Sequence, residues 1–266
     1  MLTNYHTHST FCDGKNSPEE IVRYAIDKGF VAIGFSGHGY TPYDLRYCMK
    51  DTETYASTVL QLKEKYKDKI QVYLGVEEDA FAPVDRSLFD YIIGSSHYYH
   101  VKDKYYPIDS SIDYFRKCIE VFEGDAERMA EEYFSAFCNY ILTRKPDIIG
   151  HYDLITKFDE KHTDLFLGNA KYHAIVKKYT KIIASDGHIF EANTGAIARG
   201  LRTSIYPAEN LLYIIKNSDS GLILASDSHT VETLDAHFDE TRAFLKDIGF
   251  EYIYFLLDGR FQKDYL

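Results

Sequence analysis

The chain has 266 residues, of which 45% are hydrophobic and 27% are charged, and its formal net charge is -11 at pH 7. These proportions are ordinary for a soluble globular protein, and the strong negative charge disfavours a nucleic-acid-binding surface, although not a local basic pocket. No apolar run approaches the roughly 20 residues that cross a bilayer, and the first residues, MLTNYHTHS, lack the basic and apolar regions of a signal peptide. We therefore expect a cytoplasmic protein whose partners include neither a membrane nor a nucleic acid.

Short apolar runs alternate with helical patterns along the chain. The first helix is predicted at 17–29, because Ser17 is a good N-cap, Pro18 suits the first helical position and Gly29 ends the pattern. Further helices are predicted at 52–68, 111–144 with a break near Gly124, 170–185, 207–218 and 231–249. Strands are predicted at the run that carries His6 and His8 and at 30–38, 70–78, 89–97, 146–153, 188–195, 221–229 and 252–257.

This alternation predicts an α/β fold built on a parallel sheet. No linker or repeat divides residues 1–266, so a single domain is expected. A (β/α) barrel is favoured over an open doubly wound sheet, since no GxGxxG follows the first strand.

Metal-binding side chains gather where the predicted strands end. His6 and His8 alternate on one strand and therefore share a face, which suits the binding of one metal ion. The later strands end in the following polar residues: His38; Glu77, Glu78 and Asp79; His97; His151 and Asp153; Glu191 and Asn193; Asp227 and His229. In barrel enzymes the active site lies at the carboxyl ends of the strands, so these side chains predict one shared site.

Mixed imidazole and carboxylate ligands suit Zn, Mn or Fe better than Ca or Mg alone. A carboxylate such as Glu77 or Asp227 can bridge two cations, and paired metals make hydroxide available at neutral pH. Strand alternation allows only one of Glu77 and Glu78 to face the site. Hydrolysis by a metal-bridging hydroxide is the expected reaction.

The ordered motifs HTH (6–8), GH (37–38), GVE (75–77), SSH (95–97), GHYDL (150–154) and SDSH (226–229) resemble those of the polymerase and histidinol phosphatase (PHP) family. Within it, the short chain and the stretch EANTGAIARGLRTSIYP (191–207) are most similar to the monofunctional histidinol-phosphate phosphatases. The resemblance spans essentially the whole chain. It implies a distorted (β/α)7 barrel with three divalent metal ions and the hydrolysis of L-histidinol phosphate to L-histidinol and phosphate.

The resemblance also implies a distribution of ligands. The first metal would be held by His6, His8, Glu77 and Asp227, and the second by Glu77, His97 and His151. The third would take His38, His229 and a residue of the turn after the first strand. Many relatives have a histidine at that turn, whereas the nearest candidate in this chain is Asp13.

Substrate contacts are expected next to the metals. Arg199 and Arg202 can form bidentate contacts with phosphate oxygens, and His38 and Asn193 are further candidates for substrate binding, with Lys157 and Arg116 as weaker ones. Asp227 or a nearby histidine, such as His229, would protonate the leaving oxygen.

Two alternatives remain open: hydrolysis of another phosphate ester, nucleotide or single-stranded DNA end, and a non-catalytic metal-binding module. The expected assembly is a monomer or small homo-oligomer.

Overall fold

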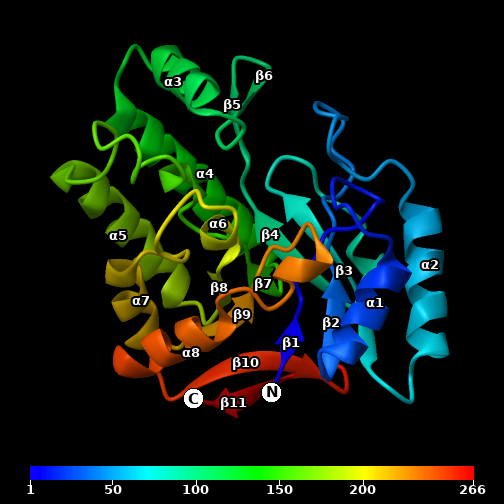
Figure 1. Cartoon of the computed structure of the whole chain (residues 1–266). Coiled ribbons are helices and arrows are strands. Elements are labelled where there is room, and N and C mark those ends of the chain that lie inside the picture. The colour runs from blue at the N-terminus through cyan, green and yellow to red at the C-terminus, as the bar shows by residue number, and fades with distance from the viewer.

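The computed structural model describes all 266 residues and contains a barrel of seven parallel strands (Figure 1). In sheet order these strands are β1 (Thr3–Asn4), β2 (Ala32–Phe35), β3 (Gln71–Asp79), β4 (Tyr91–Ser95), β7 (Ile148–Ile149), β8 (Ile189–Asn193) and β9 (Gly221–Ala225). A parallel bridge between Thr7 and Ser228 joins the chain after β1 to the chain after β9 and closes the ring. The predicted distorted seven-stranded barrel is therefore confirmed.

Helices flank the barrel on two sides. They are α1 (Pro18–Asp27), α2 (Thr52–Lys65), α3 (Ile112–Val121), α4 (Ala126–Arg144), α5 (Ala170–Ala184), α6 (Gly195–Ala198), α7 (Glu209–Lys216) and α8 (Phe238–Asp247). Figure 1 shows α1 and α2 on one flank and α4, α5 and α7 on the other. Ser17 caps α1 in a capping box with Glu20, and the predicted break near Gly124 separates α3 from α4, with Gly124 at φ +82. None of these helices has the length and apolar character needed to span a bilayer.

Three connections differ from the expected alternation. The chain passes from β3 to β4 with only a short 3-10 turn, η1 (Arg86–Leu88), and no helix. A hairpin of β5 (Tyr98–Val101) and β6 (Lys104–Pro107) follows β4 and was not predicted, because its turn uses Lys102 and Asp103 at positive φ and lacks an Asn-Gly or Asp-Gly signal. The C-terminal strand β11 (Arg260–Tyr265) was also missed, since its sequence RFQKDY is largely polar.

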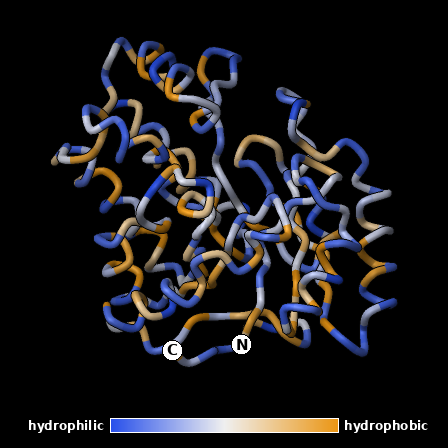
Figure 2. The backbone as a smooth tube through the Cα atoms, viewed as in Figure 1, coloured by the Kyte–Doolittle hydropathy of each residue, from blue (hydrophilic) through white to orange (hydrophobic).

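The amino-terminal end of the barrel is sealed by β10 (Tyr252–Leu257), which pairs with β11 and with β9. Figure 1 shows β10 and β11 crossing below the barrel, and Figure 2 shows that β10 is largely hydrophobic. The Tyr5 hydroxyl donates to the carbonyl of Leu256 (2.6 Å) inside a buried cluster. That cluster comprises Tyr5, Ala32, Tyr73, Tyr91, Ile93, Ile148, Ile223, Phe255 and Leu256. With this end closed by apolar packing, the opposite end is left for polar chemistry.

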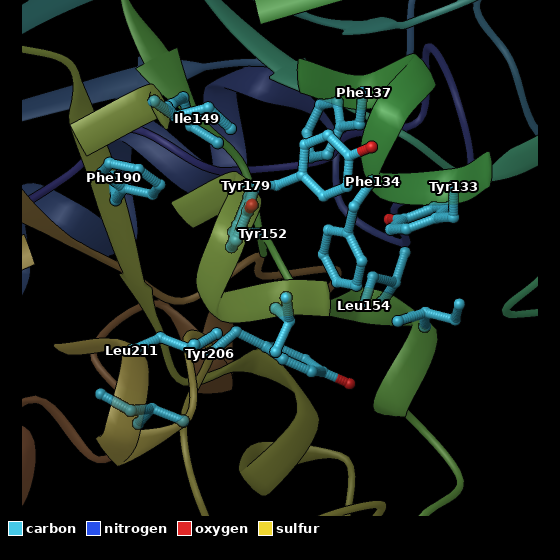
Figure 3. Close-up of a cluster of buried hydrophobic side chains, with 14 of the residues drawn as sticks. Tyr133, Phe134, Phe137, Ile149, Tyr152, Leu154, Tyr179, Phe190, Tyr206 and Leu211 are labelled. Atoms are coloured by element: carbon cyan, nitrogen blue, oxygen red, sulfur yellow. The ribbon is translucent and has the colours of Figure 1, made fainter. Parts of the chain in front are cut away.

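The largest part of the core lies between the barrel and helices α4 and α5 and is rich in aromatic rings (Figure 3). Phe134 and Phe137 of α4 pack on Tyr152, with ring centroids 5.4 and 5.9 Å apart, and Tyr152 packs edge-on against Phe190 of β8. Such contacts add to the area that the rings bury. They fix the segment after β7, which carries His151, relative to the next strand.

Candidate metal centre

Strand β3 ends in two glutamates that face opposite ways, as strand alternation requires. Glu77 points into the barrel mouth, where five histidines surround it. Glu78 points toward α4, where Arg144 donates to both of its oxygens (3.1 and 2.6 Å) and Tyr140 adds a third bond (2.7 Å). The geometry thus selects Glu77 for the site and gives Glu78 a structural role.

Replacing Arg144 with methionine should lower the free energy of unfolding by about 2–4 kcal/mol, because it leaves the buried Glu78 carboxylate without its cation. Urea unfolding of the variant measures this loss. Arg86→Met is the matched control: Arg86 pairs with Asp147 on the surface (2.7 Å), and such exposed pairs contribute less than about 1 kcal/mol. Equal small losses in both variants would contradict a structural role for Glu78.

The first predicted ligand group comes together around Oε2 of Glu77. Nε2 of His6 and Nε2 of His8 lie 3.5 and 3.7 Å from that oxygen, and 3.6 and 3.1 Å from Oδ1 of Asp227. All four side chains are almost fully buried. His6 and His8 lie beyond the short strand β1, not on a strand as predicted, because β1 ends at Asn4. The segments after β1 and β9 and the end of β3 aim two imidazoles and two carboxylates at one point.

The second predicted group gathers on the other oxygen of Glu77. Nε2 of His151 lies 2.9 Å from Oε1, and Nε2 of His97 lies 3.3 Å from it. Because the two oxygens of Glu77 face two different sets of imidazoles, this carboxylate could be shared by two cations.

The third predicted group lies nearer the surface, and Asp13 is at its centre. The Asp13 carboxylate lies 3.2 Å from Nδ1 of His8, 3.6 Å from Nε2 of His38 and 3.3 Å from Nε2 of His229. Its side chain is 33% exposed and that of His229 is 27% exposed. Nδ1 of His38 also lies 2.7 Å from Oε2 of Glu77, so His38 lies between the third group and Glu77.

The donor atoms of these groups fit metal ions. Four buried atoms lack a hydrogen-bond partner, namely His6 Nε2, His8 Nε2, Glu77 Oε2 and His151 Nδ1, whereas buried polar groups in proteins are normally paired. His6 Nε2, His8 Nε2 and Glu77 Oε2 belong to the first group. Burial opposes protonation of His6, yet the carboxylates of Glu191, Glu77 and Asp227 outweigh it and raise the pKa of His6 well above its usual value. The carboxylates around His6 therefore favour positive charge there, whereas burial and the neighbouring imidazoles of His229 and His38 lower the pKa of His8.

Glu191 lies behind the candidate ligands and holds the imidazole of His6 and the backbone of His151. Nδ1 of His6 donates to Oε1 of Glu191 (2.6 Å), which leaves Nε2 for the site. The other oxygen of Glu191 accepts from the His151 backbone N–H and from the Asn193 amide. Asn193, a predicted substrate-binding residue, is fully buried, and its amide donates to Glu191, which is the geometry of a residue that positions the ligands. The sequence identified Glu191 only as a polar residue at a strand end. Its contacts with His6 and His151 are visible only in the folded barrel.

His97 is held in a similar way by Asp79. Oδ2 of Asp79 accepts from the backbone N–H of His97 (2.9 Å) and lies 3.2 Å from Nδ1 of its ring, so that Nε2 faces Glu77. Oδ1 of Asp79 accepts from the hydroxyl of Tyr43 (2.6 Å). The ring of Tyr43 stacks on Tyr105 of the β5–β6 hairpin, with centroids 3.6 Å apart. The hairpin is thereby linked to a ligand of the second group.

Replacing Asp79 with asparagine should weaken metal binding at the second group by about 10–100-fold, the usual cost of losing a carboxylate behind a ligating histidine. Competition with a chelator, followed by metal analysis, measures the change. Asp68→Asn, at an exposed position after α2, is the matched control and should bind metal as the unchanged protein does. Unaltered metal affinity in Asp79→Asn would rule out the positioning role.

The two candidate phosphate arginines have different surroundings. Arg199 donates to Oδ2 of Asp227 (2.7 Å) and to its carbonyl oxygen (2.9 Å), and it lies 3.5 Å from Nδ1 of His229 with about a third of its side chain exposed. Arg202 is only 8% exposed; it donates to Thr156 and Ser204 and packs over the ring of Tyr206. Arg199 thus lies at the site, whereas Arg202 is engaged inside the protein and is not placed to bind phosphate.

The charges around Asp227 determine whether its carboxyl group can act as the general acid. Burial favours the neutral carboxyl, but Arg199 and the nearby histidines outweigh it and hold the pKa of Asp227 well below its usual range. A carboxylate with such a low pKa carries no proton at neutral pH. Asp227 is therefore suited to be a ligand rather than the general acid.

A cavity of about 270 Å³ opens beside the second and third groups. It is lined by Asp13, His38, Asp44, Arg46, Tyr47, His97, Tyr98, Pro107, Asp109 and Ser110. A larger hollow of about 940 Å³ lies between α5 and α7 and contains none of the ligand groups. We place the reaction at the smaller cavity, because only that one adjoins the candidate metal ligands.

Comparison with known proteins identifies the family of this chain. Residues 4–195 match the family model of the PHP domain, which is more than half of the chain. The chain belongs to the PHP family. The match covers the candidate ligands from His6 to His151, while Asp227 and His229 lie beyond it.

Curated relatives align over nearly the whole chain. A probable histidinol-phosphatase of Schizosaccharomyces pombe is 27% identical over 274 residues, covering 94% of this chain and 87% of the relative. The histidinol-phosphatase of Lactococcus lactis is 23% identical over 256 residues, covering 93% of this chain and 91% of the relative.

Solved structures share the fold of this PHP chain. A structure from Listeria monocytogenes superposes with a TM-score of 0.77 at 20% identity, covering 90% of this chain and 99% of that one. The histidinol phosphate phosphatase of Lactococcus lactis, solved with zinc, L-histidinol and phosphate, gives a TM-score of 0.73 at 22% identity, with 98% of both chains covered.

Proposed function

We propose that this protein is a metal-dependent phosphatase that hydrolyses L-histidinol phosphate to L-histidinol and phosphate. Its membership of the PHP family and the names of its full-length relatives support this reaction class and substrate. The observation that carries the proposal is the position of Glu77. Its two oxygens face two separate sets of imidazoles, the arrangement expected of a carboxylate shared by two ions.

Three divalent ions, of Zn, Mn or Fe, would occupy the three groups of ligands. When bound, such ions lower the pKa of water and neutralise the charge of a phosphate ester. The chain itself orients the ligands: Glu191 holds His6, Asp79 holds His97, and Arg199 holds Oδ2 of Asp227 so that Oδ1 faces His6 and His8.

We assign the contact with phosphate oxygens to Arg199, which lies beside His229 at the exposed edge of the site. Arg199 offers a guanidinium close to Asp227, where it can balance the negative charge that grows on the equatorial oxygens during phosphoryl transfer. His229 and His38 border the third group, so they face the same bound ester. A cytoplasmic location and a monomer or small homo-oligomer remain part of the proposal.

A substrate panel tests this function against its alternatives. The metal-loaded protein should show a kcat/KM for L-histidinol phosphate at least about 100-fold above that for nucleoside monophosphates, and no release of nucleotides from single-stranded DNA. Preferred hydrolysis of a nucleotide would make the protein another kind of PHP phosphoesterase. Failure to hydrolyse any phosphate ester, despite full metal loading, would favour a non-catalytic metal-binding module.

A further inference from the structure

The cavity beside the metal ligands contains a carboxylate that the proposed chemistry does not use. Asp109 follows the β5–β6 hairpin and is held near the second ligand group, because the backbone N–H of the preceding residue, Ile108, donates to the carbonyl of His97 (3.0 Å). It shares the cavity wall with His38 and His97. An ester whose phosphate lies on the metal groups and whose alcohol half extends into this cavity would place that half near Asp109.

One oxygen of Asp109 is already bound, while the other is available. Nζ of Lys157 donates to the carbonyl of Asp109 (2.7 Å) and lies 3.3 Å from Oδ2. No protein donor reaches Oδ1, and 29% of the side chain is exposed. Although burial opposes ionisation, Lys157, His97 and His151 together lower the pKa of Asp109, so it is charged at neutral pH.

The other two carboxylates of the cavity have their oxygens engaged. Arg46 donates to both oxygens of Asp44 (2.8 and 2.5 Å), and the hydroxyl of Tyr98 adds a bond of 2.9 Å. Both oxygens of Asp13 face histidines of the third group. Asp109 is therefore the carboxylate of this cavity with an oxygen free to accept from a ligand.

We propose that Asp109 binds the ammonium group of the substrate and makes the site selective for phosphate esters of amino alcohols. This inference rests on the proposed function. In L-histidinol phosphate, the carbon that carries the ammonium is bonded to the carbon that carries the ester oxygen. The ammonium therefore stays close to the reacting phosphate, where Asp109 lies beside the second ligand group. Tyr47 and Tyr98, on the same cavity wall, offer aromatic surface to the rest of the alcohol.

The test compares two substrates that differ only in the amine: L-histidinol phosphate and 3-(imidazol-4-yl)propyl phosphate. Asp109→Asn should lower kcat/KM for L-histidinol phosphate by about 10–100-fold, the effect of losing one charge-assisted hydrogen bond. It should change the rate with the amine-free ester less than about threefold, so the preference for the amine disappears. Asp109→Glu keeps the charge and should keep part of that preference.

Asp103→Asn is the matched control, because Asp103 lies in the exposed turn of the same hairpin at φ +62, a conformation that asparagine tolerates. It should leave both rates unchanged. The inference is overturned if Asp109→Asn keeps the preference for the amine, or if it slows both esters equally, which would indicate a structural effect. If the unchanged protein hydrolyses the amine-free ester but not L-histidinol phosphate, the proposed substrate itself is wrong.

Discussion

Replacing Asp227 with alanine should lower phosphate release from L-histidinol phosphate far beyond the roughly 100-fold loss typical of residues behind a ligand. One oxygen of Asp227 faces both His6 and His8, and the other accepts from Arg199. The substitution therefore removes a candidate ligand and releases the arginine assigned to phosphate. Steady-state phosphate release by the variant, with its metal content measured in parallel, checks this result.

Asp219→Ala is the matched control for this experiment. Asp219 is exposed in the loop that precedes β9, at the opposite end of the strand that leads to Asp227. The control should keep full activity, and circular dichroism should show that both variants fold. Undiminished turnover by folded Asp227→Ala would mean that the ligand assignment is wrong.

Removing the metals should destabilise the folded protein strongly. Without cations, the buried carboxylates of Glu77 and Asp227 lie among imidazoles whose nitrogens lack partners. Ions that bind only the folded state at about 1,000 times their Kd stabilise it by about 4 kcal/mol. For a chain of this size, that corresponds to a fall of about 10 °C in Tm on chelation.

Calorimetry of the metal-loaded and chelated protein measures this shift, and adding the metal back should restore the original Tm. Asp227→Ala serves as a comparison, because its Tm should depend less on metal than that of the unchanged protein. An identical Tm before and after chelation would show that the three groups do not hold stabilising ions.

The sequence predicted the barrel and the clustering of the candidate ligands because both depend on local pattern. Each parallel strand ends at the same rim, so His6, His38, His97 and His151 could be assigned to one site from their positions after apolar runs. The GVE motif (75–77) and the alternation of side chains along a strand were enough to choose Glu77 over Glu78 as the residue that faces the site. The structure also brings Asp13, the least typical candidate, into contact with three histidines.

Other features depend on contacts between distant segments, which spacing along the chain does not reveal. Arg199 and Arg202 are three residues apart, yet one reaches Asp227 and the other packs over Tyr206. Asn193 follows the same strand pattern as the ligands, but it lies behind them next to Glu191. The β5–β6 hairpin, which supplies Tyr98 and Pro107 to the wall of the cavity, turns at two residues that give no strong turn signal.

The most direct test of this account is the rate of phosphate release from L-histidinol phosphate as metal is added stepwise to the chelated protein. We predict no turnover without metal, and a rate that rises with the ions bound and levels off at three per chain. A chelated protein that releases phosphate at the full rate, or a fully loaded protein that releases none, would contradict the account.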